Sequence, residues 1–219
     1  MGAFSETLQA LAGLFFPPDA SCSLCGGEGR VSEGYGVCAA CDAALPKICG
    51  KIAVCGTPVL AAFRYDGGAA RMIQDLKYNG KRYLARSLAC YIKDTLESAD
   101  EPLPDAIIPV PLHRKRRRKR GYNQSDIICR HLSALTGVPW LNGVLIRTRD
   151  TPSQTGLGRQ ERIENVKGAF DVIEKEPVKG RKILLVDDVC TTGATLDACA
   201  DALYRAGAIN VTAAVAAHG

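Results

Sequence analysis

Two adjacent carboxylates, Asp187 and Asp188, follow an apolar run and precede a stretch of threonine and glycine in ILLVDDVCTTGAT, residues 183–195. The apolar run predicts a buried strand, and the residues from about Thr195 onward predict a helix. Free backbone N–H groups at a helix start bind phosphate together with threonine hydroxyls, and ionised carboxylates accept hydrogen bonds from sugar hydroxyls. The stretch therefore predicts a sugar phosphate site. The alternative is an ordinary strand–turn–helix in which Thr195 caps the helix.

Seven consecutive basic residues, 114–120, follow a second apolar segment, DAIIPVP at 105–111. Without them, 21 basic residues stand against 23 acidic ones, so the net charge of +5 is concentrated in this run. Such a concentration indicates a site for phosphate, nucleic acid or acidic lipid, and a solvated or disordered stretch is the alternative. Because a strand precedes the run and a helix begins near Asn123, we expect an anchored loop at the binding edge of a sheet.

The first residues of this basic run are placed for a diphosphate, but seven cations exceed what one diphosphate uses. The surplus favours DNA as a second anion. The candidate residues for a diphosphate or nucleic acid are Arg114, Arg116, Arg117, Arg118 and Arg120. Only one aromatic residue, Tyr122, lies beside the run, so we expect base stacking to contribute little.

Four cysteines form two pairs, with two residues inside each pair and twelve between the pairs: Cys22, Cys25, Cys38 and Cys41. Four thiolates at this spacing can close a tetrahedral structural Zn²⁺ site, and a redox or disulfide role is the alternative. Residues 22–56 are poor in branched apolar side chains, so their fold is expected to depend on the metal. Cys49 and Cys55 are expected to replace a cysteine of the second pair, to pack beside the site, or to be partly exposed to solvent.

The rest of the chain alternates strands and helices. Strands are predicted at 59–66, 105–111, 144–149, 169–173, 182–188 and 210–218, and helices at 69–80, 81–98, 123–135 and 196–207. The near-continuous apolar strands predict an α/β fold, with a parallel sheet covered by helices on both faces. Because such sheets bind ligands at the carboxyl ends of their strands, the loops after Val110 and Asp187 form the candidate site. The polar segment 151–168 is long enough to be an arm or lid.

Two unequal parts are expected. Residues 1–58 would hold an N-terminal helix, with apolar residues spaced along 4–15, and the zinc-binding module, and residues 59–219 would form the α/β domain. No stretch approaches the roughly 20 apolar residues that span a bilayer, and no secretory leader is recognisable. We therefore expect a cytoplasmic protein, because thiols stay reduced in that compartment.

These motifs resemble a known family. VDDVCTTGAT resembles the phosphoribosyl pyrophosphate (PRPP) signature of type I phosphoribosyltransferases. Together with the cysteine pairs, LKY at 76–78, VPLHRKRRRKRGYNQS and TPSQTGLGRQERIENVKGAF, it makes the chain similar to the ComF family of competence-associated proteins from about residue 15 onward. The resemblance implies a type I phosphoribosyltransferase-like sheet flanked by helices, with a small zinc-binding module before it.

The resemblance also implies roles for individual residues. Asp187 and Asp188 would hold the ribose 2- and 3-hydroxyls and act as the catalytic carboxylates, while Mg²⁺ and cations meet the charge of the leaving diphosphate. The 5-phosphate would be held by Val189, Cys190, Thr191, Thr192, Gly193, Ala194 and Thr195, with Cys190 acting through its backbone. Val110, Pro111 and Leu112 would form the diphosphate loop. Residues 149–168 would form a hood or arm, and Lys77 and Arg162 would be supporting cations.

The function expected from these features is PRPP binding by a phosphoribosyltransferase-like protein linked to DNA uptake in natural transformation. The loops carry no readable code for the acceptor of a transfer reaction. The alternative is a non-catalytic module that handles single-stranded DNA and uses the fold as a scaffold or nucleotide sensor. The expected partners are PRPP and, through the basic run, single-stranded DNA and DNA-uptake proteins.

Overall fold

The computed structural model describes residues 21–28, 30–54, 56–100, 102–151 and 158–219. The helix expected within residues 4–15 lies outside the described residues, as does Cys55. No helix in the described ranges is long and apolar enough to cross a membrane.

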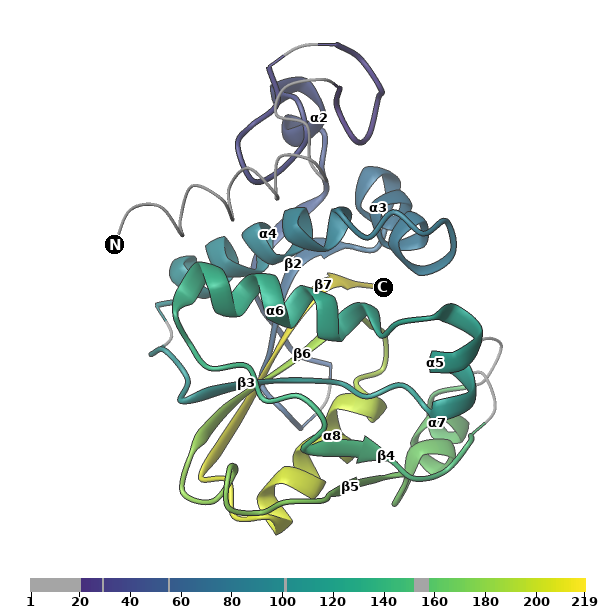
Figure 1. Cartoon of the computed structure of the whole chain (residues 1–219), viewed down its shortest axis with the longest axis vertical. Helices are drawn as coiled ribbons and strands as arrows, with labels where there is room; N and C mark the ends of the chain where they lie inside the picture. The colour runs from purple at the N-terminus through teal and green to yellow at the C-terminus, as the bar shows by residue number, and fades with distance from the viewer. Residues whose placement is uncertain (1–20, 29, 55, 101, 152–157) are drawn as a thin grey trace, which may run out of the picture.

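A five-stranded sheet forms the centre of the fold, in the order β1-β2-β7-β6-β3 (Figure 1). Its strands are β1 (Lys47–Ile52), β2 (Val59–Arg64), β3 (Ala106–Pro109), β6 (Lys182–Cys190) and β7 (Asn210–His218). Strands β2, β7, β6 and β3 run parallel, and β1 pairs antiparallel with β2 at one edge. The predicted parallel sheet is thus confirmed, with one antiparallel edge strand added.

Helices cover both faces of this sheet, as the apolar strands predict. On one face lie α3 (Gly67–Tyr78), α4 (Leu84–Ser98) and α6 (Gln124–Thr136), which share a buried core with β2. On the other face, α8 (Ala194–Arg205) packs against a small antiparallel pair, β4 (Leu145–Arg147) and β5 (Phe170–Val172). Figure 1 shows the first set of helices above the sheet and α8 with β4 and β5 below it.

The basic run is a helix, α5 (Arg114–Arg120), so the predicted loop is wrong. Arginine and lysine are good helix formers, and their positive charge suits the C-terminal end of a helix. At the start, the side chain of His113 accepts a hydrogen bond from the N–H of Lys115. At the end, Gly121 has φ of 84°, a left-handed conformation that glycine adopts readily, and its N–H donates to the carbonyl of Arg117. Both helix ends are therefore capped.

The segment that contains the cysteine pairs is docked on α4. After a short helix, α2 (Ala39–Ala43), the chain enters β1 and joins the main sheet. The hydroxyl of Tyr35 donates to the carboxylate of Asp94, at 2.8 and 3.0 Å, and the hydroxyl of Tyr91 donates to Asp42 at 2.6 Å. Buried side chains from the segment, Leu24, Val37 and Leu45, belong to the same core cluster as α4. The segment therefore borrows a core that it cannot build alone.

Within the predicted polar arm, residues Arg159–Val166 form helix α7, and 152–157 lie outside the described residues. Beyond it, β6 continues through Cys190, and α8 begins at Ala194 after Gly193, which has φ of 76°. Asp197 in the first turn of α8 accepts hydrogen bonds from the N–H groups of Gly56 and Thr57, at 3.2 and 2.8 Å. These bonds fix the start of α8 against the chain that leads into β2.

Candidate functional site

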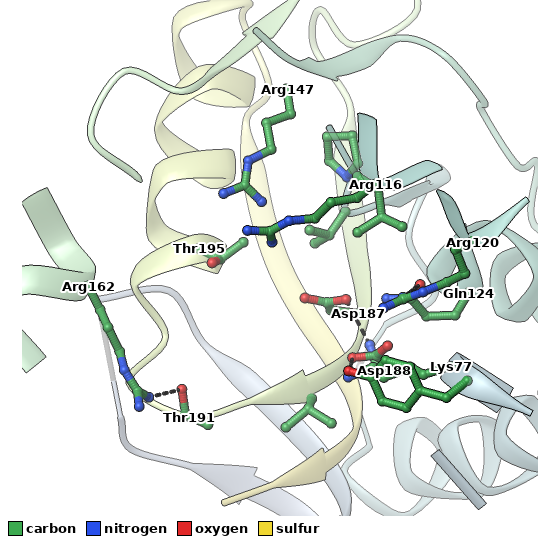
Figure 2. A pocket seen from close by; sticks show the side chains of 15 residues that line it. Lys77, Arg116, Arg120, Gln124, Arg147, Arg162, Asp187, Asp188, Thr191 and Thr195 are labelled. Atoms are coloured by element: carbon green, nitrogen blue, oxygen red, sulfur yellow. Dashed lines mark hydrogen bonds and ion pairs between the residues drawn. The ribbon is translucent and has the colours of Figure 1, made fainter. Parts of the chain in front are cut away.

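A cavity of about 390 Å³ lies at the carboxyl ends of β3 and β6, where the sequence predicts the site (Figure 2). This volume lies within the range of ordinary small-molecule sites. The residues that line it are Lys77, Tyr78, Val110, Pro111, Leu112, Arg116, Arg120, Gln124, Arg147, Arg162, Asp187, Asp188, Val189, Thr191 and Thr195. The cavity therefore brings together the two predicted loops and side chains from α3, α5, α6, α7 and β4.

The two adjacent carboxylates at the end of β6 are held by different neighbours. Oδ1 of Asp187 accepts hydrogen bonds from the hydroxyl of Ser125, at 2.8 Å, and from the N–H of Asp188, at 2.9 Å. Oδ1 of Asp188 forms an ion pair with Nζ of Lys77 at 2.8 Å. Oδ2 of Asp188 is buried and has no hydrogen-bond partner within the described chain. A buried acceptor of this kind is costly unless a ligand supplies a donor.

The charges of this group are strongly coupled. Burial, together with the neighbouring charge of Asp188, raises the pKa of Asp187 to about 7. Burial lowers the pKa of Lys77, but the charge of Asp188 and its hydrogen bond outweigh burial and leave this pKa raised. The ammonium group therefore stays charged beside Asp188. Ser125, which sequence reasoning missed, is fully buried at the start of α6 and is recognisable only once α6 is placed beside β6.

Four guanidinium groups enter the cavity from three elements. Arg116 and Arg120 lie four residues apart on α5, so they share one face of that helix. Arg162 of α7 donates to the hydroxyl of Thr191 at 2.7 Å, and Arg116 donates to the carbonyl of Thr151 at 2.9 Å. Figure 2 shows the guanidinium groups of Arg116 and Arg147 pointing toward one another near Thr195. The lining of the cavity is therefore strongly cationic around the two carboxylates.

Arg147 was missed by sequence reasoning. It ends the three-residue strand β4, it is 9% exposed, and its Nε is buried with no hydrogen-bond partner within the described ranges. Burial, and then the charge of Arg116, lower the pKa of Arg147. The guanidinium donates to the hydroxyl of Thr151 and interacts with the charges of Asp187 and Asp150, so Nε is the buried donor that a bound anion could satisfy. The one signal in the sequence was an arginine at the end of a short strand that leads into the polar arm.

The other predicted residues divide into two groups. Val110, Pro111, Leu112, Val189, Thr191 and Thr195 line the cavity, whereas Cys190, Thr192, Gly193 and Ala194 are not part of its lining. Cys190 is buried, and its backbone carbonyl accepts a hydrogen bond from the N–H of Gly219 at 3.0 Å. Thr195 does not cap α8, because the cap position is Gly193. Arg114, Arg117 and Arg118 are exposed outside the cavity.

The structure brings the predicted metal ligands together. The sulfur atoms of Cys22, Cys25, Cys38 and Cys41 all lie within 4.8 Å of one another. In a tetrahedral site with metal–sulfur bonds of about 2.3 Å, neighbouring sulfurs are roughly 3.8 Å apart. The Sγ atoms of Cys25 and Cys38 are 3.9 Å apart, so these four cysteines could hold a metal ion.

Backbone N–H groups donate to two of the four sulfurs. The N–H of Cys38 donates to the sulfur of Cys22 at 3.3 Å, and the N–H of Gly27 donates to that of Cys25 at 3.4 Å. Burial raises the pKa of Cys22, but hydrogen bonds from the backbone N–H groups of Cys25 and Cys38 outweigh burial and lower it to about 6. Cys49 lies outside the cluster, with its sulfur 3.9 Å from the carbonyl of Ala62.

Known proteins that resemble this chain include a phosphoribosyl transferase domain family and proteins named for DNA utilization and competence. The family described as phosphoribosyl transferase domain matches residues 118–219. The DNA utilization protein YhgH of Salmonella typhimurium is 32% identical over 200 residues, which cover 87% of this chain and 86% of that protein. Competence protein F of Haemophilus influenzae is 38% identical over 141 residues, 62% of either chain, so this match spans less than two thirds of the relative's length. Among solved structures, adenine phosphoribosyltransferase from Leishmania tarentolae has 13% identity and a TM-score of 0.44, with coverage of 76% of this chain and 80% of that chain.

The fold, the cavity at the carboxyl edge of the sheet and the domain match define a phosphoribosyltransferase-like protein. More narrowly, the chain belongs to the ComF family, which includes competence protein F and the DNA utilization protein YhgH. The resemblance stated from the sequence motifs is therefore confirmed.

The raised pKa of Asp187 predicts a pH-dependent gain of stability on neutralising this residue. The folded protein holds a proton on Asp187 up to about pH 7, whereas the unfolded chain loses it near pH 4. The stability that this group contributes is full below pH 4, falls as pH rises, and is lost above pH 7. We expect Asp187→Asn to increase the free energy of unfolding at pH 8 by roughly 1–3 kcal/mol, because the variant has no buried charge at this position. The gain is smaller than the full pKa shift implies, because solvent in the cavity screens the carboxylate. Urea denaturation measures this gain, which should shrink toward pH 4.

The matched variant is Asp188→Asn, which should give no such gain because it removes the ion-pair partner of Lys77. Equal destabilisation by both variants at pH 8 would contradict the prediction.

Proposed function

We propose that the cavity binds PRPP, and the observation that carries this proposal is the buried, unpartnered Oδ2 of Asp188 in a cavity that four arginines also line. A sugar that carries phosphates offers both kinds of partner, because its hydroxyls donate and its phosphates accept. A simple anion would leave the carboxylates without donors, and a neutral sugar would leave the guanidinium groups without an anion. The family match supports the same ligand.

The proposed roles follow from position. Asp187 and Asp188 accept hydrogen bonds from the ribose 2- and 3-hydroxyls. The 5-phosphate lies in the Thr191–Thr195 turn at the start of α8, with Arg162 beside Thr191. The diphosphate lies at Val110–Leu112, opposed by the cavity-facing cations of α5 and by Arg147. Lys77 holds Asp188 in place until the sugar arrives.

The residues present also fit Mg²⁺ carried by PRPP. Mg²⁺ prefers oxygen ligands and commonly binds through one or two carboxylates together with substrate phosphates, and Asp187 and Asp188 lie at the cavity. When bound, the ion neutralises part of the charge on the departing diphosphate. The chain's own part is to orient the sugar through two carboxylates and to stabilise diphosphate charge through fixed guanidinium groups.

We propose type I phosphoribosyl transfer as the reaction. This chemistry needs placement and charge stabilisation more than a protein nucleophile, and the cavity provides both. A screen of common nucleobases and ammonia for pyrophosphate release from PRPP tests catalysis and identifies the acceptor. Confirmed PRPP binding with a silent screen would instead favour the nucleotide-sensor alternative.

PRPP binding is expected to depend on the two carboxylates. Asp187→Ala combined with Asp188→Ala removes acceptors that are worth roughly 1.5–3 kcal/mol each, so affinity should fall at least about 100-fold. Titration calorimetry with PRPP and Mg²⁺ measures the change. Asp201→Ala, at an exposed position of α8, is the matched control. No binding by the intact protein, or undiminished binding by the double variant, would sink the proposal.

We further propose that the four-cysteine cluster holds a structural Zn²⁺. Four sulfur ligands close a tetrahedral site and leave no position for a substrate. The metal-bearing unit is proposed as residues 1–58 and the transferase-like unit as 59–219, with β1 linking them by its pairing with β2.

Loss of one cysteine ligand should remove the metal and lower stability. We expect Cys25→Ser to lose about one equivalent of zinc and to melt well below the parent protein, because the module has little core of its own. Metal analysis by mass spectrometry and thermal denaturation measure the two effects. Cys49→Ser should keep its zinc, since its sulfur lies at Ala62 outside the cluster. A zinc-free parent protein with an unchanged melting temperature after chelation would contradict the assignment.

A second function, handling of single-stranded DNA, is favoured by the outer surface of α5. Arg116 and Arg120 face the cavity, and the other basic residues of the helix are exposed: Arg114, Lys115, Arg117, Arg118 and Lys119. Lys115 pairs with Asp150 at 3.0 Å. The outward cations are surplus to PRPP, and relatives are named for DNA utilization and competence. We therefore propose that the protein acts in DNA uptake together with other uptake proteins. We place this role in the cytoplasm, because cysteine thiols stay reduced there and can bind the proposed metal.

The two faces of α5 should separate the two ligands. Arg117→Gln with Arg118→Gln should weaken binding of single-stranded DNA and make the plot of log affinity against log salt shallower, by about 0.7 for each phosphate that the variant no longer neutralises. Arg116→Gln with Arg120→Gln should weaken PRPP binding instead. Fluorescence anisotropy across a salt series and calorimetry measure these effects. An unchanged salt slope in the outward pair would show that DNA does not use this surface.

A further inference from the structure

Tyr78 is an exposed aromatic residue at the rim of the cavity. It is the last residue of α3, lines the cavity, and is 72% exposed, more than any other large hydrophobic side chain in the described chain. Burial in the core therefore does not explain an aromatic ring at this position.

Three other tyrosines that pack with the helices on the same face of the sheet have structural partners. Tyr35 and Tyr91 donate to carboxylates, and Tyr122 donates to the carbonyl of Leu76. The ring of Tyr122 is also covered by the guanidinium of Arg82, 4.5 Å from the ring centroid. Among the described residues no hydrogen bond holds the hydroxyl of Tyr78, and most of this side chain remains exposed to a ligand.

One neighbour links Tyr78 to the basic helix. The guanidinium of Arg120 lies 5.4 Å from the centroid of the Tyr78 ring. Arg120 is the last residue of α5 and also lines the cavity. The ring therefore lies at the cavity rim beside the last residue of α5, although α3 ends at Tyr78 and α5 begins only at Arg114.

This combination matches the chemistry of single-stranded nucleic acid. A positive surface tracks the phosphates, and an exposed aromatic ring stacks on a base of any sequence, because every base has a π face. In duplex DNA the base faces are already stacked on one another, so a ring beside the backbone gains little. The sequence placed only Tyr122 beside the basic run, but that ring is occupied by structural contacts.

We propose that Tyr78 is a stacking platform for one base of a single strand whose phosphates lie on the outward face of α5. The inference rests on the proposed DNA function and adds the binding mode. The guanidinium of Arg120 lies over one face of the ring, so the base stacks on the other face, and the strand passes the mouth of the cavity rather than entering it.

The test compares Tyr78→Ala and Tyr78→Phe for binding of an oligothymidylate by fluorescence anisotropy. The alanine variant should bind about tenfold more weakly, whereas the phenylalanine variant should bind like the parent because the ring is kept. Tyr204→Ala is the matched control, since Tyr204 is 46% exposed on α8, across the sheet. Its affinity for the strand should be unchanged. Equal affinity of Tyr78→Ala and the parent would overturn the platform.

Two further ligands separate stacking from charge. An abasic oligonucleotide of the same length has the phosphates without the bases, so Tyr78→Ala should bind it as the parent does. Tyr78→Ala and the parent should also bind duplex DNA equally. An equal loss on the abasic strand would show that Tyr78 does not act through a base, and this would overturn the stacking role. No binding of the oligothymidylate by the parent protein would overturn the DNA function as well, whereas a failure confined to Tyr78 would leave it standing.

Discussion

Burial of two adjacent carboxylates at the end of β6 constrains the elements around them. Like charges at neighbouring positions cannot both ionise in a low-dielectric site without compensation. Lys77 meets Asp188 from the last turn of α3, and Ser125 meets Asp187 from the first turn of α6. The start of α6 also directs the positive end of its helix dipole toward this pair. Both helices therefore lie on the same face of the sheet, with α3 ending and α6 beginning at its carboxyl edge. The cavity opens at this same edge.

The cysteine segment is connected to this arrangement through aromatic packing. The rings of Tyr35 and Phe63 each lie edge-on to Tyr91, with centroids 4.8 Å apart in both pairs. Tyr35 belongs to the segment, Tyr91 to α4 and Phe63 to β2. Edge-to-face contacts of this kind add to the area that the rings bury. The segment is thereby held to the sheet by aromatic side chains as well as by the strand pairing of β1.

What the sequence predicts well follows from strong local patterns. The βαβ unit at the C-terminal end was recognisable because its strands are continuously apolar, and the cysteine cluster was recognisable from its spacing. Strand β1 was missed, because KICGKI carries lysine at two positions and an irregular register between Lys47 and Gly50. Arg147 and Ser125 were missed because each acts through elements distant in sequence. Arg147 lies on a strand of only three residues, and Ser125 contacts Asp187 across 62 positions.

The basic run shows why secondary structure decides function here. In a loop, seven cations could all turn toward one ligand, and the charge count alone would argue for a single, highly anionic site. In a helix, residues four apart share a face, so only Arg116 and Arg120 reach the cavity, and the residues between and beside them point elsewhere. Apart from Lys115, which pairs with Asp150, the outward cations therefore repel one another, and the proposed diphosphate in the cavity would not contact them. In the proposed function, a second polyanion along the outer surface would relieve that repulsion, and the helical period is the physical reason for proposing two anions rather than one.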